Sequence, residues 1–351
     1  MFRSHSEKFN ANVSKTIDIV HWQEELRNLI YPPSNQPEEA AENVELLETF
    51  RTTSPPKIDW RIHDHCAAIS RLYALFEEAI CEIVTDYVRL TPKYFPKFED
   101  LREPFRKQYR IGIGTILTKW APSNSLFPFA EENIAAGLAD GLRGYDKYNL
   151  LADAFLLTSE NFRWSTVNKI LSDIGIDKPM SLIEKDQHLS SFKEQSLMDL
   201  GSPANYLDSF VRARNEAAHG TITNVLGIKK LKEYAEFISI IVAAIGRLLC
   251  SDLIKQGLKT GETVLSAKVI KKFSDNVVVV EAVTNTSLTV GDILYVGKKN
   301  VIRAEVVSIR TGSTQHDKIE LGALQRFGLK MDVPLKENFL LYRIKPETDP
   351  G

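Results

Sequence analysis

The chain has 351 residues, of which 43% are hydrophobic and 26% are charged, and these values are ordinary for a globular protein of two domains. The formal net charge of −2 excludes a general polyanion binder, so any nucleic-acid surface has to be local. Three widely spaced cysteines exclude a disulfide framework and a zinc site, and they indicate reduced thiols in a cytoplasmic protein.

The sequence gives no sign of a membrane segment. Its N-terminus is polar and lacks the apolar stretch of a signal peptide. The most apolar run, residues 237–245, is far shorter than the roughly 20 residues that cross a bilayer. We therefore expect no membrane partner.

The first part of the chain is predicted to form three helices. Apolar spacing predicts an amphipathic helix over residues 1–31 and a short acidic helix over residues 38–50, and a Pro-Pro pair follows each. We interpret residues 1–56 as an arm that packs on the main domain, with partner binding as the alternative. The next helix is long, over residues 59–90, because its apolar positions keep a period of 3.6.

The main domain, residues 57–256, is predicted to be an all-α bundle. Its principal members are the long helix just described, a motif helix over residues 202–220 and a final helix over residues 228–256. Shorter helices are predicted between them, over residues 98–119, 129–142, 147–158, 165–174 and 190–197.

The motif helix, SPANYLDSFVRARNEAAHG, has clear ends. Ser202 is a good N-cap, Pro203 suits the first helical position, and Gly220 is placed to end the last turn. Because each terminal signal falls at the right position, the sequence predicts where this helix begins and ends.

One position of the motif helix breaks its hydrophobic pattern. Leu207 and Val211 begin an inward-facing stripe, and Arg214 and Ala218 occupy its next positions. Burying a guanidinium without compensation is costly, so the pattern implies a partner, a ligand or a wet cleft around Arg214.

Two further polar residues follow Arg214. Asn215 and His219 are four apart and share a face of the helix, whereas Arg214 and His219 lie about 140° apart around its axis. Ala217 and Ala218 form a small-residue surface that a second backbone can approach closely.

The residues RNEAAH, from Arg214 to His219, resemble the Arg, polar residue, spacers and His signature of HEPN domains. These are all-helical modules, and many are metal-independent ribonucleases of toxin and phage-defence systems. The resemblance implies catalytic roles for Arg214, Asn215 and His219, with no metal ion and no cofactor. A surface arginine near a helix-terminal histidine is the plain alternative.

Residues 72–88, LYALFEEAICEIVTDYV, resemble the first long helix of defence-type HEPN domains, in which an aromatic residue and a glutamate recur. The resemblance places Tyr73 and Glu77 on the face that meets the motif helix. Glu77 then either holds Arg214 by a charge-assisted hydrogen bond or is a solvated acid.

A metal site at His63, Asp64 and His65 is not favoured. Helical residues that are two apart point in different directions and make a poor chelating pair, so a structural or surface role is preferred.

The character of the chain changes after residue 257. Short β-rich runs alternate with turn residues, which predicts a small closed barrel over residues 258–346. Its six strands are predicted over residues 263–270, 276–283, 292–296, 302–309, 318–321 and 339–344.

The LTVGD turn at residues 288–292 and the VVSIR strand at residues 306–310 resemble the second, β-barrel domain of translational GTPases. GTPase motifs are absent from the sequence, so the resemblance implies only the barrel. In translation factors such barrels contact RNA or ribosomal partners. The resemblance therefore predicts a basic RNA-binding patch on the barrel, and scattered surface charges are the alternative. The candidate residues of the patch are Lys271, Lys272, Lys298, Lys299, Arg303 and Arg310.

Cleavage of RNA through its own 2′-OH needs a base, an acid and stabilisation of the phosphorane. His219 suits proton transfer and Arg214 suits phosphate binding. A single histidine does not easily serve as both acid and base, so two motifs sharing one cleft in a homodimer are predicted.

Two functions from different classes follow. The first is a metal-independent endoribonuclease that acts as a toxin or antiviral effector on RNA, with an antitoxin or a defence-system protein as a further partner. The second is a non-catalytic module that keeps the motif for dimerisation or nucleotide binding.

Overall fold

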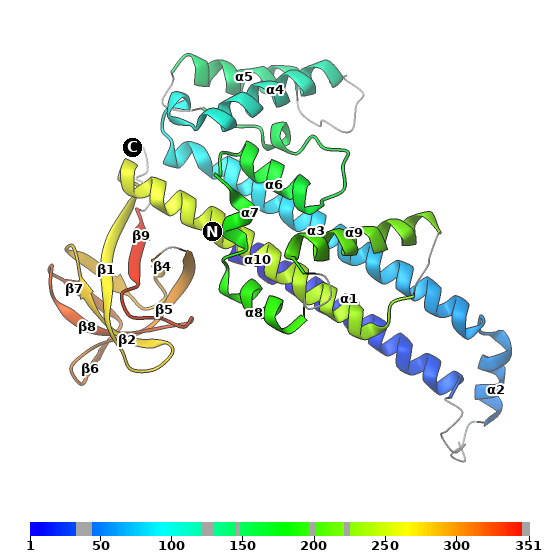
Figure 1. Ribbon diagram of the computed structural model, residues 1–351. Coiled ribbons are helices and arrows are strands. Elements are labelled where there is room, and N and C mark those ends of the chain that lie inside the picture. The colour runs from blue at the N-terminus through cyan, green and yellow to red at the C-terminus, as the bar shows by residue number, and fades with distance from the viewer. Residues whose placement is uncertain are drawn as a thin grey trace.

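The computed structural model describes residues 1–32, 44–120, 130–144, 148–196, 201–220, 225–298 and 300–345, with no account of the side chains at 44–47 and 195–196. Figure 1 shows a helical body built around long helices and, beyond the end of the last one, a β-barrel. The predicted order, an all-α part and then a barrel, is confirmed.

The described residues form ten α-helices and two short 3₁₀ turns. The helices are α1 (Arg3–Ile30), α2 (Val44–Thr53), α3 (Lys57–Tyr94), α4 (Glu103–Lys119), α5 (Glu131–Leu142), α6 (Trp164–Asp173), α7 (Pro179–Ile183), α8 (Gln187–Ser196), α9 (Pro203–His219) and α10 (Ile228–Thr260). The 3₁₀ turns are η1 (Phe98–Asp100) and η2 (Ala152–Phe155).

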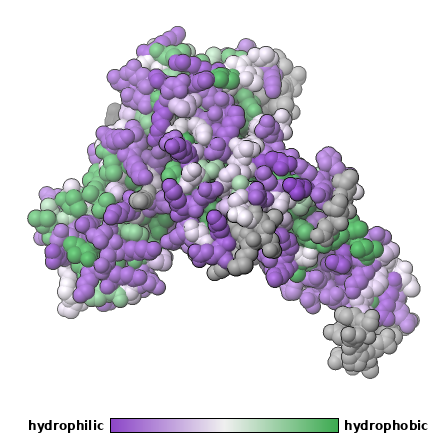
Figure 2. Space-filling view, viewed as in Figure 1, coloured by the Kyte–Doolittle hydropathy of each residue, from purple (hydrophilic) through white to green (hydrophobic). Residues whose placement is uncertain are grey.

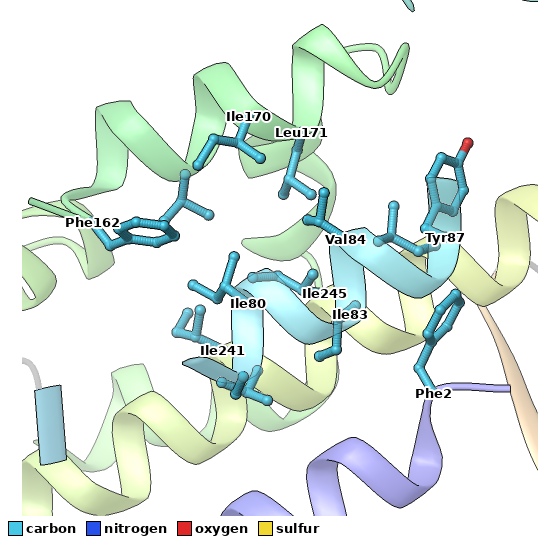
Figure 3. Packing of buried hydrophobic residues seen from close by; sticks show 14 of the residues in the cluster. Phe2, Ile80, Ile83, Val84, Tyr87, Phe162, Ile170, Leu171, Ile241 and Ile245 are labelled. Atoms are coloured by element: carbon cyan, nitrogen blue, oxygen red, sulfur yellow. The ribbon is translucent and has the colours of Figure 1, made fainter. Parts of the chain in front are cut away.

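The core lies where α3 meets α10. The 3.6-residue period of α3 places apolar residues on several sides of the helix, where they pack against α10 and α1 and against α9 and η2. Figure 3 shows Ile83 of α3 beside Ile245 of α10, with Phe162 and Leu171 on the other side of α3. These side chains are almost fully buried, so α3 is the central element of the body.

The first helix belongs to the same core. Phe9, Val13 and Val20 of α1 are buried in the hydrophobic cluster that contains α3 and α10. Arg27 of α1 also forms a buried ion pair with Asp64 of α3. The N-terminal helix therefore packs on the main domain rather than standing apart from it.

The helix predicted over residues 147–158 is wrong. In the described part of that segment the chain makes only the turn η2, and it runs directly against α4. Gly112 leaves room for this contact, because a Cβ there would meet the carbonyl oxygen of Ala154 at 2.1 Å. The Leu151 N–H is bonded to the Tyr109 hydroxyl at 3.2 Å instead of a helical carbonyl. Tertiary contacts on several sides thus replace the helix that local apolar spacing predicted.

By length and composition, α10 could cross a membrane, and among the described helices it alone could. However, 67% of its most apolar window is buried inside the protein, against α1, α3 and the barrel. Its apolar side chains therefore have partners within the protein. Figure 2 shows that hydrophilic residues cover most of the visible face of the helical body.

The barrel is a closed ring of six strands in the order β4-β9-β1-β2-β8-β5, and β4 closes it by pairing with β5. All pairs are antiparallel, and β6 extends the sheet beyond β5. The strands of this sheet are β1 (Thr263–Lys272), β2 (Val277–Ala282), β4 (Ile293–Gly297), β5 (Val301–Thr311), β6 (Thr314–His316), β8 (Arg326–Met331) and β9 (Leu340–Ile344).

Two strands lie outside the ring. β3 (Thr286–Thr289) and β7 (Lys318–Leu321) pair with each other in a separate two-stranded sheet. The strand predicted over residues 318–321 is therefore not a barrel strand, and its place in the ring is taken by β8, which the sequence analysis missed. Gly328 at the centre of β8 weakens the local strand pattern.

The barrel is fixed to the helical body rather than hanging from a linker. The Val301 N–H donates a buried hydrogen bond of 2.6 Å to the hydroxyl of Ser251 in α10. Tyr295 and Tyr342 join the hydrophobic cluster of the helical body, and the Met1 amine donates to the Tyr295 hydroxyl at 3.0 Å.

Candidate active site

The helix that carries the motif is formed as its terminal residues predict. The Ser202 hydroxyl accepts a hydrogen bond from the Asn205 N–H at 3.2 Å, and Pro203 is the first helical residue. Gly220 has a φ of 69° and bonds back to the Glu216 carbonyl, a left-handed conformation that glycine adopts without strain. His219 is consequently the last residue of α9.

The inward-facing stripe of α9 changes character along its length. Leu207 and Val211 are fully buried, Arg214 is half-buried, and Ala218 is exposed. The stripe thus leaves the core at Arg214, which lies at the boundary between the packed interior and solvent. That position allows a charged group to be held in place while part of it stays accessible.

Three neutral groups hold the guanidinium of Arg214. The centre of the guanidinium lies 4.3 Å from the centroid of the Tyr73 ring of α3, close enough for a cation–π interaction. The Nη1 atom donates to the Oδ1 atoms of Asn161, at 2.9 Å, and of Asn215, at 3.0 Å. Arg214 forms no ion pair with any described residue, so its positive charge is not neutralised there.

Tyr73 and the loop before α6 form a rigid seat for this arginine. Tyr73 is 2% exposed, its hydroxyl accepts from the Phe162 N–H at 2.8 Å, and its ring contacts Phe210 of α9. Burial raises the pKa of the Tyr73 phenol, so it stays neutral at physiological pH. The resemblance placed Tyr73 at the α3–α9 contact, and that is where it lies.

Asn161 was missed by the sequence analysis. It is 53 residues from Arg214 along the chain, in a loop with no recognisable pattern, and only the fold brings the two together. Its Oδ1 atom accepts from Arg214 and lies 3.4 Å from the Tyr73 hydroxyl.

The hydrogen bond considered between Glu77 and Arg214 is absent: among the described residues, the carboxylate of Glu77 forms neither a hydrogen bond nor an ion pair with the guanidinium. Glu77 is half-buried on α3, one turn after Tyr73, and its charge adds to the rise in the pKa of the Tyr73 phenol. The neutral amides of Asn161 and Asn215 take the place that the glutamate was expected to fill.

His219 and Asn215 take different positions at the end of α9. His219 is exposed and, within the described part of the chain, its ring makes no hydrogen bond. Asn215 is half-buried and uses its Oδ1 atom to hold Arg214, which leaves its amide N–H groups for another acceptor. An exposed imidazole and a fixed guanidinium therefore lie near the same end of α9, about 140° apart around its axis.

The basic residues predicted as one patch fall into two groups. Lys271 and Arg310 lie on the outer face of the barrel, on β1 and β5, whereas Lys272, at the end of β1, pairs with the buried Val278 and lies on the other face of the strand. Lys298 and Arg303 belong to the β4–β5 hairpin, where Arg303 lies near enough to the Met1 amine to influence its pKa. Lys299 is outside the described residues.

His63, Asp64 and His65 do not converge on a metal site. The His63 side chain is 80% exposed, whereas Asp64 is buried with Arg27 and His65 is buried elsewhere on α3 without a described metal-ligand partner. Across the described ranges, no three His, Cys, Asp or Glu side chains gather in a way that could hold a metal ion.

An all-α body in which one helix presents an arginine, a neighbouring asparagine and a terminal histidine is the architecture of a HEPN domain. The chain belongs to the RiboL-PSP-HEPN family, whose model matches residues 38–251. HEPN domains are usually ribonucleases or nucleotide-binding modules. Searches of curated proteins and of solved structures gave no match. The family match ends before the barrel, so the likeness of the barrel to translational GTPases stays a prediction.

Proposed function

We propose that this protein is a metal-independent endoribonuclease in which Arg214, Asn215 and His219 act on RNA. The resemblance of the motif to defence-type HEPN domains supports a role as a toxin or antiviral effector, with an antitoxin or a defence-system protein as its regulator. The observation that carries the proposal is the state of Arg214: it is rigidly held, half-buried and bound only by neutral groups among the described residues.

The chemical consequence of that state is a preference for anions. A buried or half-buried guanidinium without a carboxylate retains its full positive charge in a medium of reduced dielectric constant. A phosphate would compensate that charge through charge-assisted hydrogen bonds, and the fork geometry of arginine matches phosphate oxygens. Two of the groups around Arg214 are amide oxygens, which orient the guanidinium without neutralising it.

Each residue then has one task. Arg214 stabilises the charge that develops on the phosphorus oxygens, and the free N–H groups of Asn215 donate to one of them. His219 transfers the proton, either from the attacking 2′-OH or to the leaving 5′ oxygen. The bond from the 2′ oxygen to phosphorus forms as the bond to the 5′ oxygen breaks.

The second proton transfer calls for a second motif. We extend the proposal to a homodimer in which two α9 helices face each other and two His219 residues divide the acid and base tasks. The exposure of Ala218 supports this arrangement, because a small residue on the solvent side of α9 lets a second backbone come close. Repulsion between two arginines opposes the dimer, so phosphate or salt is expected to favour it.

The direct test is incubation of the purified protein with single-stranded RNA in the presence of EDTA. Accumulation of discrete fragments would support the nuclease. Tight binding of a nucleotide without cleavage of RNA would instead assign the same arginine to a binding module.

Asn161→Ala should lower cleavage by about tenfold while the protein stays folded. The variant removes one hydrogen bond from a charged donor to a neutral amide, worth roughly 1.5–3 kcal/mol, so Arg214 keeps its charge but loses part of its orientation. Glu77→Gln is the matched control, because among the described residues Glu77 forms no hydrogen bond or ion pair with the guanidinium, and it should leave cleavage within about twofold. Initial rates on a fluorescent RNA measure both. Equal losses of cleavage rate in the two variants would show that the Asn161 amide does not position Arg214.

Mixing Arg214→Ala with His219→Ala subunits should restore part of the activity that each variant lacks alone. In a mixed dimer, the shared cleft contains one intact Arg214 and one intact His219, whereas in each pure variant it lacks both copies of one of these residues. The measurement is the cleavage rate of the mixture against each pure variant at equal concentration, with light scattering to verify assembly. A wild-type enzyme that is monomeric and active at assay concentration would rule out the shared site.

A further inference from the structure

The outer face of the barrel strands β1, β2, β8 and β5 carries a local concentration of positive charge. Side chains alternate strictly on β2 and β8, so that the buried apolar residues face the barrel interior and the intervening residues face solvent. The basic residues on this outer face are Lys268, Lys271, Arg310, Arg326 and Lys330.

Some of this charge is neutralised and some is not. Arg326 pairs with Glu281 across the β2–β8 ladder at 2.9 Å. The other four, Lys268, Lys271, Arg310 and Lys330, form no ion pair with any described residue. The face is thus positive although the whole chain has a formal net charge of −2.

The strand register places these charges around a centre that has little side-chain bulk. Lys271 of β1, Val279 of β2, Gly328 of β8 and Arg310 of β5 are successive cross-strand partners. With strands about 4.8 Å apart, Lys271 and Arg310 are about 14 Å apart along the curved sheet. Lys330 lies two residues along β8 from Gly328.

The centre of this row has no bulky or charged side chain. The Val279 side chain is half-buried and Gly328 has no side chain, so a flat ligand can lie close to the sheet there. Phe273, at the β1–β2 turn beside this row, is 66% exposed, with the Lys271 ammonium 5.4 Å from its ring centroid. An exposed aromatic ring next to unpaired cations is a poor surface for water but a good platform for a nucleobase.

We propose that this face binds single-stranded RNA, with phosphates on Lys271, Arg310 and Lys330 and a base stacked on Phe273. Single strands are favoured over duplexes because stacking on Phe273 needs an unpaired base, and the open surface at Val279 and Gly328 can accept a second one. RNA binding by this face does not depend on the proposed nuclease. Only the fate of the bound strand rests on the proposed function, since that strand would be the substrate of the α9 site.

The test measures the binding of a fluorescent 20-nucleotide RNA that carries 2′-O-methyl groups and so cannot be cleaved through its own hydroxyl. The full-length double variant Arg310→Gln, Lys330→Gln is compared with Lys232→Gln, Lys318→Gln, which loses the same charge from exposed positions on α10 and β7. Anisotropy at several salt concentrations gives both the affinity and its salt dependence.

The face variant should bind at least about tenfold more weakly than wild type, and its log K against log salt slope should be shallower by about 1.4, or roughly 0.7 per lost phosphate contact. The control pair should retain the wild-type slope. Phe273→Ala should weaken binding by about tenfold with the slope unchanged, because stacking releases no counterions.

The inference is overturned if the face variant and the control pair bind alike, or if a duplex of the same sequence binds better than the single strand. A poly-glutamate peptide that binds the face when RNA does not would assign the surface to an acidic protein instead. Failure of the nuclease is distinguishable: wild type would then bind the methylated strand through this face and leave ordinary RNA uncut.

Discussion

Replacing His219 with alanine should lower the rate of RNA cleavage by about 10²–10⁴-fold, the usual effect of losing a group that transfers a proton in the transition state. His219 is exposed, and its ring contacts no described residue by a hydrogen bond, so the fold should be unaffected. Arg214→Ala should cost about 10²–10³-fold, because it removes the charge that stabilises the phosphorane. Single-turnover cleavage of a defined RNA measures both.

Matched controls separate the site from general effects of charge. His21→Ala removes an exposed histidine from α1, and Arg212→Ala removes an exposed arginine from α9 itself. Both should cleave within about twofold of wild type. If either site variant cleaves at the wild-type rate, the assignment of Arg214 and His219 is wrong. Circular dichroism of each variant shows whether a loss of activity reflects a loss of fold.

A substrate that lacks a single 2′-hydroxyl at the cut site should not be cleaved there at all. The 2′ oxygen is the nucleophile in the proposed reaction, so its removal leaves no group to attack the phosphorus. The measurement is a comparison of an RNA with its single 2′-deoxy counterpart, on the same gel, with cleavage elsewhere as an internal control.

The ends of the products report the same chemistry independently. Attack by the 2′ oxygen leaves a 2′,3′-cyclic phosphate or a 3′-phosphate on one fragment and a 5′-hydroxyl on the other. Mass spectrometry of the fragments distinguishes these ends. A 3′-hydroxyl with a 5′-phosphate would indicate attack by water, which is usually assisted by a metal ion, and would contradict the proposed mechanism.

The parts of this protein that sequence predicts well are those governed by local rules. Ser202 and Gly220 fix the ends of α9 because caps act over a few residues, and Arg214 draws attention as a charge in a hydrophobic stripe. The long helices α3 and α10 follow from sustained 3.6-residue periodicity. The positions of Tyr73 and Arg214 against each other were implied by the family resemblance, and the α3–α9 packing supplies the contact.

The parts that sequence does not predict depend on distant contacts. Asn161 holds Arg214 from a loop that no pattern marks, and its amide fills the place considered for Glu77. The segment around Ala154 loses its expected helix to packing against α4, where Gly112 admits its backbone. β8 was missed because Gly328 weakens its local pattern, although its partners on β2 and β5 fully determine it.

The continuity of α10 has a consequence for where an RNA would be cut. This helix begins shortly after the motif helix and runs 33 residues, about 50 Å, to the first strand of the barrel. The Ser251–Val301 hydrogen bond and the shared hydrophobic cluster also fix the barrel to α10, so the α9 site and the barrel are held at a fixed separation. An RNA strand that is bound at the barrel and cut at the α9 site would be cleaved at a set number of nucleotides from the bound segment, whatever its sequence in between.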